Sequence, residues 1–151
     1  MVAVFHPKTP QNIGTLWRTA QQCGAAALIT VGTRYTRERT DTYQATKHVP
    51  LYHVLTFDEL LMWQPVDSCL VGIEIGWKPL STFTHPERAV YLLGAEDHGL
   101  PPSVLDRCQQ VISLEAAAQP SYNVAVAGSL VLYHRCFLAK QGDRHAISDH
   151  Q

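Results

Sequence analysis

Short apolar runs alternate with polar or amphipathic segments along the whole chain. The apolar runs predict six β-strands, because they are rich in β-branched and aromatic residues and are bounded by turn formers. Most of these runs are continuously apolar, which is typical of parallel strands buried on both faces. The predicted strands cover residues 2–5, 26–31, 51–55, 69–75, 89–93 and 111–114. The pattern indicates an α/β fold with a mostly parallel sheet and helices on both faces.

Helical spacing of apolar residues predicts the helices between these strands. The first runs between Pro10 and Gly24, with Asn12 as its N-cap and Gly24 as the C′ residue. A capping box over residues 56–59 predicts a second helix through Trp63. A third is expected from the prolines at 101–102 to Cys108, because proline is tolerated in a first turn. The last helix follows a polar loop that begins at residue 119.

The last helix carries apolar residues on two different faces. One stripe contains Val126, Leu130, Tyr133 and Phe137, and the other contains Val124, Ala127, Val131 and Leu138. Packing on one sheet face needs only one stripe. The second stripe requires more of the same chain or a second subunit, and a symmetric homodimer is the preferred explanation.

Composition places the chain among soluble proteins with one domain. A single domain is expected over residues 1–140, followed by a polar tail over 141–151 without fixed structure. Charged residues make up 17% of the chain, no apolar run approaches the ~20 residues that span a bilayer, and no signal peptide is visible. The expected location is the cytoplasm, without a membrane partner. The four cysteines are scattered, which favours reduced thiols over disulfides or a metal site.

A net charge of −1 leaves any nucleic-acid contact to local basic groups. Such a group lies between the second and third predicted strands and contains Arg34, Arg37, Arg39 and Lys47. It is interpreted either as a solvated loop or as a patch that contacts phosphates.

Three stretches carry the candidate functional side chains. Gly14 and Arg18 share a face of the first helix, where a glycine suggests close approach to the backbone. The fifth strand runs into a loop with Gly94, Glu96 and Gly99, at the strand end where ligands bind in parallel sheets. It lacks the spacing of a dinucleotide or phosphate-binding loop. Glu96 either positions a substrate or bonds to local amides.

The third stretch, residues 119–133, is a polar loop that feeds the last helix and presents Ser121 and Asn123. Taken alone, these side chains and Arg18 have simple interpretations, with Arg18 as a surface ion-pair partner and Asn123 as a helix cap. Taken together, the three stretches Asn12-x-Gly14-x-x-x-Arg18, residues 93–100 and residues 121–127 resemble the signature motifs of the SpoU–TrmH family of RNA ribose 2′-O-methyltransferases, in the SPOUT superfamily.

The resemblance implies a C-terminal trefoil knot, S-adenosylmethionine as the cofactor, and an active site at a homodimer interface. It implies catalytic roles for Asn12, Arg18, Glu96, Ser121 and Asn123. The implied cofactor contacts are Gly94, Gly99, Leu114, Tyr122, Asn123 and Val124. Arg18 would grip a phosphate and stabilise the ribose alkoxide, together with RNA contacts from Arg34, Arg37, Arg39 and Lys47. No metal is implied.

Two departures from the family pattern fall near the third motif. Residues 113–118 replace an Ile-Pro-Met-like segment, and Tyr122 stands where an aliphatic residue is usual. The favoured function is methylation of a ribose 2′-hydroxyl in RNA, with tRNA preferred over rRNA because the chain has no added RNA-binding extension. The alternatives are rRNA as substrate, a non-catalytic RNA-binding or regulatory module, and, more remotely, another nucleotide-binding α/β enzyme.

Overall fold

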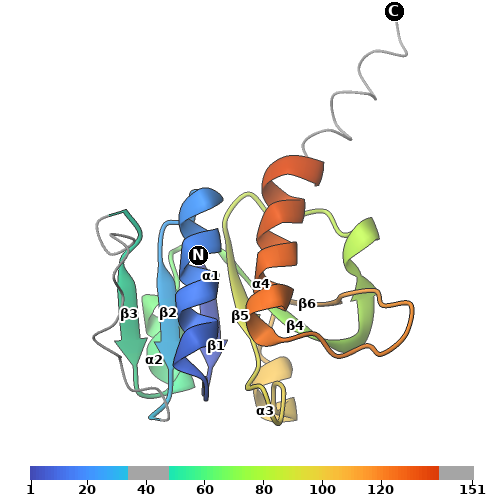
Figure 1. Ribbon diagram of the computed structural model, residues 1–151. Coiled ribbons are helices and arrows are strands. Elements are labelled where there is room, and N and C mark those ends of the chain that lie inside the picture. The colour runs from blue at the N-terminus through green and yellow to red at the C-terminus, as the bar shows by residue number, and fades with distance from the viewer. Residues whose placement is uncertain (34–47, 140–151) are drawn as a thin grey trace, which may run out of the picture.

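The computed structural model describes residues 1–33 and 48–139, and these form one six-stranded parallel sheet covered by helices (Figure 1). The strand order is β3-β2-β1-β5-β4-β6, and every pair of neighbouring strands is parallel. The strands are β1 Val2–Phe5, β2 Leu28–Val31, β3 Leu51–Val54, β4 Cys69–Pro79, β5 Ala89–Leu93 and β6 Gln110–Ser113. The α/β prediction is therefore confirmed.

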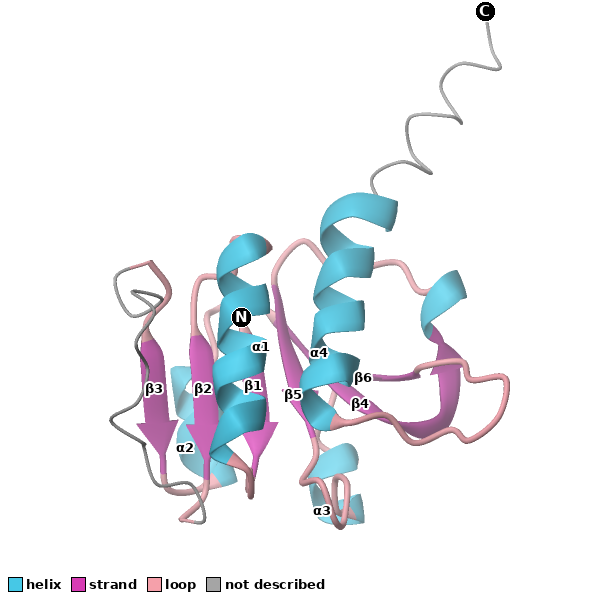
Figure 2. Cartoon of the chain, in the orientation of Figure 1, coloured by secondary structure: helices cyan, strands magenta, loops and turns pink. Residues whose placement is uncertain are grey.

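Helices stand on both faces of the sheet (Figure 2), and an apolar core lies on each face. Helices α1 Pro10–Gln22 and α4 Val124–Tyr133 cover one face and pack on Val4, Tyr91 and Leu93. Helices α2 Phe57–Trp63 and α3 Pro102–Leu105 cover the other face. The strands read as continuous apolar runs because each face of the sheet is buried.

Helix α1 differs from its prediction at its first residue. It begins at Pro10 with Thr9 as N-cap, so the expectation that Asn12 caps it is wrong. Asn12 lies inside the first turn, where its amide bonds to Glu96. The other end is as expected: Gly24 has φ +65°, and the Ala25 amide donates to the Ala20 carbonyl at 2.8 Å, as in a Schellman motif.

Strand β4 is longer than predicted, because it continues past an irregularity. Ile73 and Lys78 both align with Ile112 of β6, so the residues between them bulge out of the ladder. Helix α3 is shorter than predicted and ends at Leu105. The predicted capping box of α2 is present, with the Glu59 amide donating to the Thr56 hydroxyl at 3.1 Å.

The two predicted stripes of the last helix have different environments. Val124, Ala127 and Val131 are buried against the core, although Leu138 is not. The other stripe stays 41–53% exposed in the single chain, and it comprises Val126, Leu130, Tyr133 and Phe137. Helix α4 sits close to its neighbours, since a Cβ at Gly128 would lie 2.6 Å from the Leu16 side chain.

A polar chain ties the end of this helix to the sheet. Helix α4 continues into a π-helical segment, His134–Leu138. Arg135 Nη1 donates to the Tyr91 hydroxyl at 2.9 Å, which lies 2.6 Å from His85 Nδ1. His85 Nε2 lies 2.8 Å from His134 Nδ1. A neutral His85 suits this position, because one of its ring nitrogens can accept a hydrogen bond while the other donates one.

Some sequence predictions lie outside the described residues. These are the basic group of Arg34, Arg37, Arg39 and Lys47, and the tail over 141–151. Over the described part of the chain, no helix has the length and apolar character needed to cross a membrane.

Candidate functional site

A cavity of about 350 Å³ opens beside the irregularity of β4, where β5 ends and α4 begins. Parallel sheets place ligand sites outside the carboxyl ends of their strands, and a cavity of this size is within the range of small-molecule sites. Its walls come from three segments that are distant in sequence: residues 73–75, 93–99, and 114 with 120–127. Ile73, Leu93, Leu114 and Val124 make part of the wall apolar.

The loop after β5 forms one wall and closes tightly on itself. The Ala95 amide donates to the Gly99 carbonyl at 3.2 Å, and the Gly99 amide donates back at 3.0 Å. A Cβ on Gly94 would lie 2.3 Å from the Gly99 carbonyl carbon, and Gly99 has φ +64°. Both glycines are therefore required by the backbone itself, which leaves the loop's peptide groups bare along the cavity.

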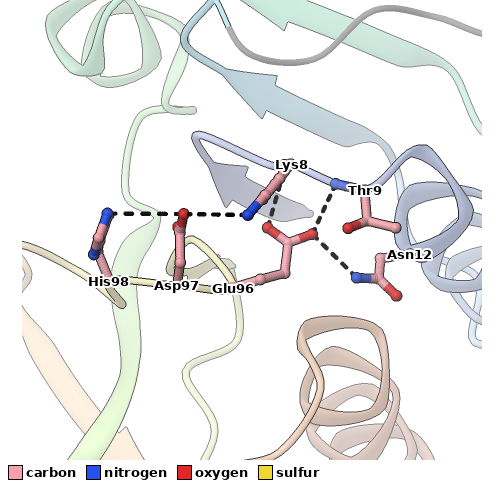
Figure 3. Close-up of polar contacts among 6 residues, drawn as sticks. All are labelled: Lys8, Thr9, Asn12, Glu96, Asp97 and His98. Carbon is pink, nitrogen blue, oxygen red and sulfur yellow. Dashed lines mark hydrogen bonds and ion pairs between the residues drawn. The ribbon is translucent and has the colours of Figure 1, made fainter.

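Glu96 is fixed by donors at the start of α1 (Figure 3). Its carboxylate accepts from the Lys8 amide at 2.9 Å, the Thr9 amide at 3.0 Å and Asn12 Nδ2 at 3.0 Å. Burial alone would raise the pKa of Glu96, but these hydrogen bonds outweigh it and lower the pKa below its usual value. Glu96 therefore stays ionised, and it is better suited to holding Asn12 than to accepting a proton.

Asn12 continues the same network to the third motif. Its Oδ1 accepts from Asn123 Nδ2 at 3.0 Å. Asn123 is the N-cap of α4, and its Oδ1 accepts from the Ala125 amide at 2.9 Å and the Val126 amide at 3.4 Å. One residue from each of the three sequence motifs is thus joined in the series Glu96, Asn12, Asn123.

The bulge of β4 supplies a further wall residue, Glu74. Its carboxylate accepts from the Ile75 amide at 3.0 Å and from the Leu100 amide at 2.7 Å. A Cβ on Gly99 would lie 2.4 Å from Glu74 Oε2, so this side chain packs directly on the glycine loop. The bulge aims Glu74 at the cavity, as bulges near functional sites often do.

The unusual segment before the third motif is held by two hydrogen bonds. The Tyr122 hydroxyl donates to the Glu115 carbonyl at 2.8 Å, and Glu115 Oε1 accepts from the Ser81 amide at 3.0 Å. Leu114, Pro120 and Tyr122 face the cavity, whereas residues 115–119 are not among its described lining. The tyrosine that departs from the family pattern therefore closes this loop while it also contributes to the wall.

The predicted site residues divide into two groups. The structure brings Gly94, Glu96, Gly99, Leu114, Ser121, Tyr122 and Val124 to the cavity wall. Asn12, Arg18 and Asn123 are not among the described lining residues. Asn12 and Asn123 join the wall through Glu96, whereas Arg18 lies on the exposed side of α1, one turn after Gly14. Outside the backbone of α1 and the two chain neighbours, no atom of the described residues lies within 4 Å of a Cβ built on Gly14, so no packing contact within the chain requires a glycine there.

Glu74 and the rest of the β4 wall were not predicted from the sequence. The candidate site was placed after β5 alone, although Ile73 of the neighbouring β4 pairs with Leu93, the last residue of β5. The alternation of Glu74 with Ile73 and Ile75 was a usable signal, because a lone acid inside a predicted buried strand needs a special environment. The bulge that provides this environment leaves no clear mark in sequence.

The chain as a whole is similar to known proteins over most of its length. The family model described as SpoU rRNA Methylase matches residues 1–133. No curated protein sequence matches the chain. Among solved structures, the SpoU methyltransferase AviRb from Streptomyces viridochromogenes is similar with a TM-score of 0.84 and 24% identity, over 93% of this chain and 60% of that one. The chain thus spans about three fifths of AviRb's length.

Two further structures extend the comparison. An AdoMet-bound rRNA methyltransferase from Sinorhizobium meliloti has a TM-score of 0.77 and 25% identity, over 90% of this chain and 56% of that one. A structure that concerns 2-OH methylation of C/U34 on tRNA has a TM-score of 0.80 and 24% identity, over 93% of this chain and 95% of that one.

Proposed function

The chain belongs to the SpoU rRNA methylase family, and we propose that it transfers a methyl group from S-adenosylmethionine to a ribose 2′-hydroxyl of RNA. The observation that carries the proposal is the junction of the three motifs at one cavity through Glu96, Asn12 and Asn123. The resemblance noted in the sequence is confirmed at the level of the family. Methylation at the ribose 2′-hydroxyl and the choice of tRNA over rRNA are proposed in addition to family membership.

The residues that line the cavity suit S-adenosylmethionine. Bare peptide groups around Gly94 and Gly99 allow a flat base to lie against the backbone, and Leu93, Leu114 and Val124 supply apolar contacts. The polar groups of Glu74, Ser121 and Tyr122 are available for the rest of the molecule. When bound, this cofactor supplies an electrophilic methyl group on a positively charged sulfur. The AdoMet-bound structure from Sinorhizobium meliloti supports the assignment.

The chain's own residues would orient the ribose and stabilise the charge that develops on its attacking oxygen. Ser121 lies on the cavity wall at the loop before α4 and offers a short donor and acceptor to a ribose hydroxyl. Asn12 and Asn123 hold that loop in place relative to α1, which is the positioning that a poor nucleophile requires. Glu96 acts through Asn12 as a positioning residue. Arg18 would bind the adjacent phosphate and stabilise the alkoxide that forms.

We propose that the active form is a homodimer in which α4 contributes the interface. The support is the exposed stripe of Val126, Leu130, Tyr133 and Phe137 beside a fully formed core. Arg18 does not line the cavity of its own chain, so a site completed by the partner subunit's Arg18 agrees with both observations. The trefoil knot is proposed from family membership, and residues of both loops, 94–99 and 114–122, line one cavity.

We favour tRNA as the substrate over rRNA. The support is the similarity to the tRNA-related structure, which covers 93% of this chain and 95% of that one. Phosphate contacts are assigned to Arg18 and to the basic group Arg34, Arg37, Arg39 and Lys47. Neutralising this group should weaken RNA binding and flatten its salt dependence, and an unchanged slope would remove it from the interface.

The deciding experiment compares Arg18→Ala with Arg88→Ala, which removes another exposed arginine that does not line the cavity. Methyl transfer is measured by mass spectrometry of nucleosides from tRNA and rRNA, and cofactor binding by calorimetry. Arg18→Ala should lose methyl transfer by at least about 100-fold and keep cofactor binding, because an electrostatic stabiliser acts in the transition state. Full activity of this variant on its RNA would disprove the mechanism. A wild-type chain that binds no cofactor would favour the non-catalytic RNA-binding module.

A further inference from the structure

Acidic side chains outnumber basic ones on the cavity wall. Its described lining contains the carboxylates of Glu74, Glu96 and Asp97 and no lysine or arginine. Asp97 Oδ2 lies 3.8 Å from the Lys8 ammonium and 3.7 Å from the His98 imidazole, so its charge has a cationic partner. Glu96 accepts hydrogen bonds from neutral groups, namely the backbone amides of Lys8 and Thr9 and the side-chain amide of Asn12. Within residues 1–33 and 48–139, the hydrogen bonds to Glu74 come from neutral donors, the backbone amides of Ile75 and Leu100.

Glu74 is held rigidly. The register shift of β4 between Ile73 and Lys78 takes Glu74 out of the ladder with β6. The Ile75 amide donates a hydrogen bond to Oε1 and the Leu100 amide donates one to Oε2, so one acceptor position on each oxygen is occupied. Gly99 provides the space that Oε2 occupies. The carboxylate is therefore preorganised, and each oxygen keeps a further acceptor position, since an ionised carboxylate has about four in all.

Glu74 lines the cavity with a negative charge that no lysine or arginine of the described lining offsets. The cofactor proposed for this cavity changes its own charge during the reaction. S-adenosylmethionine carries one positive charge more than the product left after loss of the methyl group, which is a neutral thioether. We propose that Glu74 makes the cavity selective for the sulfonium form of the cofactor over its thioether product. This inference rests on the proposed function. It assigns Glu74 to specificity, with release of the spent cofactor favoured by loss of the attraction.

A competing role for the same carboxylate is acceptance of hydrogen bonds from the ribose hydroxyls of the cofactor, as acids do in dinucleotide sites. The two roles differ in what they recognise. A ribose contact contributes equally to S-adenosylmethionine and S-adenosylhomocysteine, because both carry the same adenosine. A charge contact contributes to the sulfonium alone. The observation that favours charge is the absence of any lysine or arginine from the described lining.

The test measures dissociation constants of both ligands by calorimetry for the wild type and for Glu74→Gln. The control is Glu87→Gln, which removes the same charge at an exposed position outside the cavity. Glu74→Gln should weaken S-adenosylmethionine by about 5- to 10-fold and S-adenosylhomocysteine by less than about twofold, as expected for one partly screened charge. Glu87→Gln should change neither. Equal weakening of both ligands by Glu74→Gln would overturn the charge role.

A second measurement needs no variant. In the wild type, the preference for S-adenosylmethionine should fall by about threefold or more between low salt and 0.5 M salt, because ions screen the attraction. A preference that does not change with salt would count against the proposal even if Glu74→Gln fails to fold. Failure of the wild type to bind either ligand would overturn the proposed function together with this inference. Binding of both with equal loss in Glu74→Gln overturns the inference alone.

Discussion

Asn12 and Asn123, which are 111 residues apart in the sequence, share a side-chain hydrogen bond of 3.0 Å. The bond fixes both amides: Asn12 must donate to Glu96 with its nitrogen, so its oxygen faces Asn123, and Asn123 must cap α4 with its own oxygen. Neither side chain keeps the freedom to act as a proton acceptor. The pair instead sets the distance between the start of α1 and the start of α4.

Replacing Asn12 by Asp tests this arrangement. An acid in the first turn of a helix is normally favourable because of the helix dipole. At this position it would place a second carboxylate about 3 Å from Glu96, and we expect a loss of about 2 kcal/mol in the free energy of unfolding. Gln11→Asp adds the same charge on the exposed side of the same turn, and it should be neutral or slightly stabilising. Urea unfolding measures both, and equal effects would refute the network.

Gly94 and Gly14 form a matched pair for alanine substitution. Gly94→Ala places a methyl group 2.3 Å from backbone that has no room to move, so we expect a loss of more than about 2 kcal/mol and of cofactor binding. Gly14→Ala meets open space in a helix and should stabilise the chain by up to about 1 kcal/mol. Thermal unfolding gives the comparison.

Gly14→Ala has a second readout, which is RNA binding. If RNA backbone approaches Gly14 in the complex, the stabilised variant should bind RNA at least about tenfold more weakly, because a methyl group would occupy the contact. Normal RNA affinity would remove Gly14 from the interface.

Stability should depend on pH through His85. Burial, followed by the nearby His134 and Arg135, lowers the pKa of His85 to about 4, below the 6.5 of a free imidazole. The unfolded chain therefore binds more protons than the folded chain between these two values. The contribution of neutral His85 to the free energy of unfolding is complete above pH 6.5 and is lost as the pH falls toward 4. For a half-buried group it should be of the order of 1 kcal/mol.

His85→Asn removes the titrating group and serves as the comparison. The difference in unfolding free energy between wild type and variant should shrink as the pH is lowered from 7 to 4. Glu96 also stabilises the fold less as the pH falls. Its contribution begins to be lost only below about pH 4.5, because its pKa in the folded chain is lowered from that value. A constant difference across the window would show that His85 does not titrate there.

The exposed stripe of α4 predicts the assembly state. Leu130→Glu places a charge in the proposed interface and should convert a dimer to a monomer at micromolar concentration, as followed by sedimentation. Met62→Glu changes a side chain that is 76% exposed on α2, and it should leave the assembly unchanged. A wild type that already sediments as a monomer would rule the interface out.

Sequence periodicity was sufficient for the sheet and for most helices, because the strands β1, β2 and β5 are buried on both faces and the helices bury apolar residues in one of the two cores. It failed where a tertiary contact replaced a local one. Asn12 has the sequence context of a helix cap, but Glu96 provides a better partner for its amide. Glu74 went unnoticed because the bulge that exposes it arises from the pairing of β4 with β6. The roles of Ser121 and Arg18 required the family resemblance.

The all-parallel order of the sheet also affects how the chain is made. Val2 pairs with Tyr91, and the start of α1 is held by Glu96, so the first strand depends on residues that are synthesised much later. At typical translation rates this delay is roughly 5 to 20 s, during which one edge of β1 has no native partner. A nascent chain of this kind is a natural client for ribosome-associated chaperones, and its yield should be sensitive to the speed of translation.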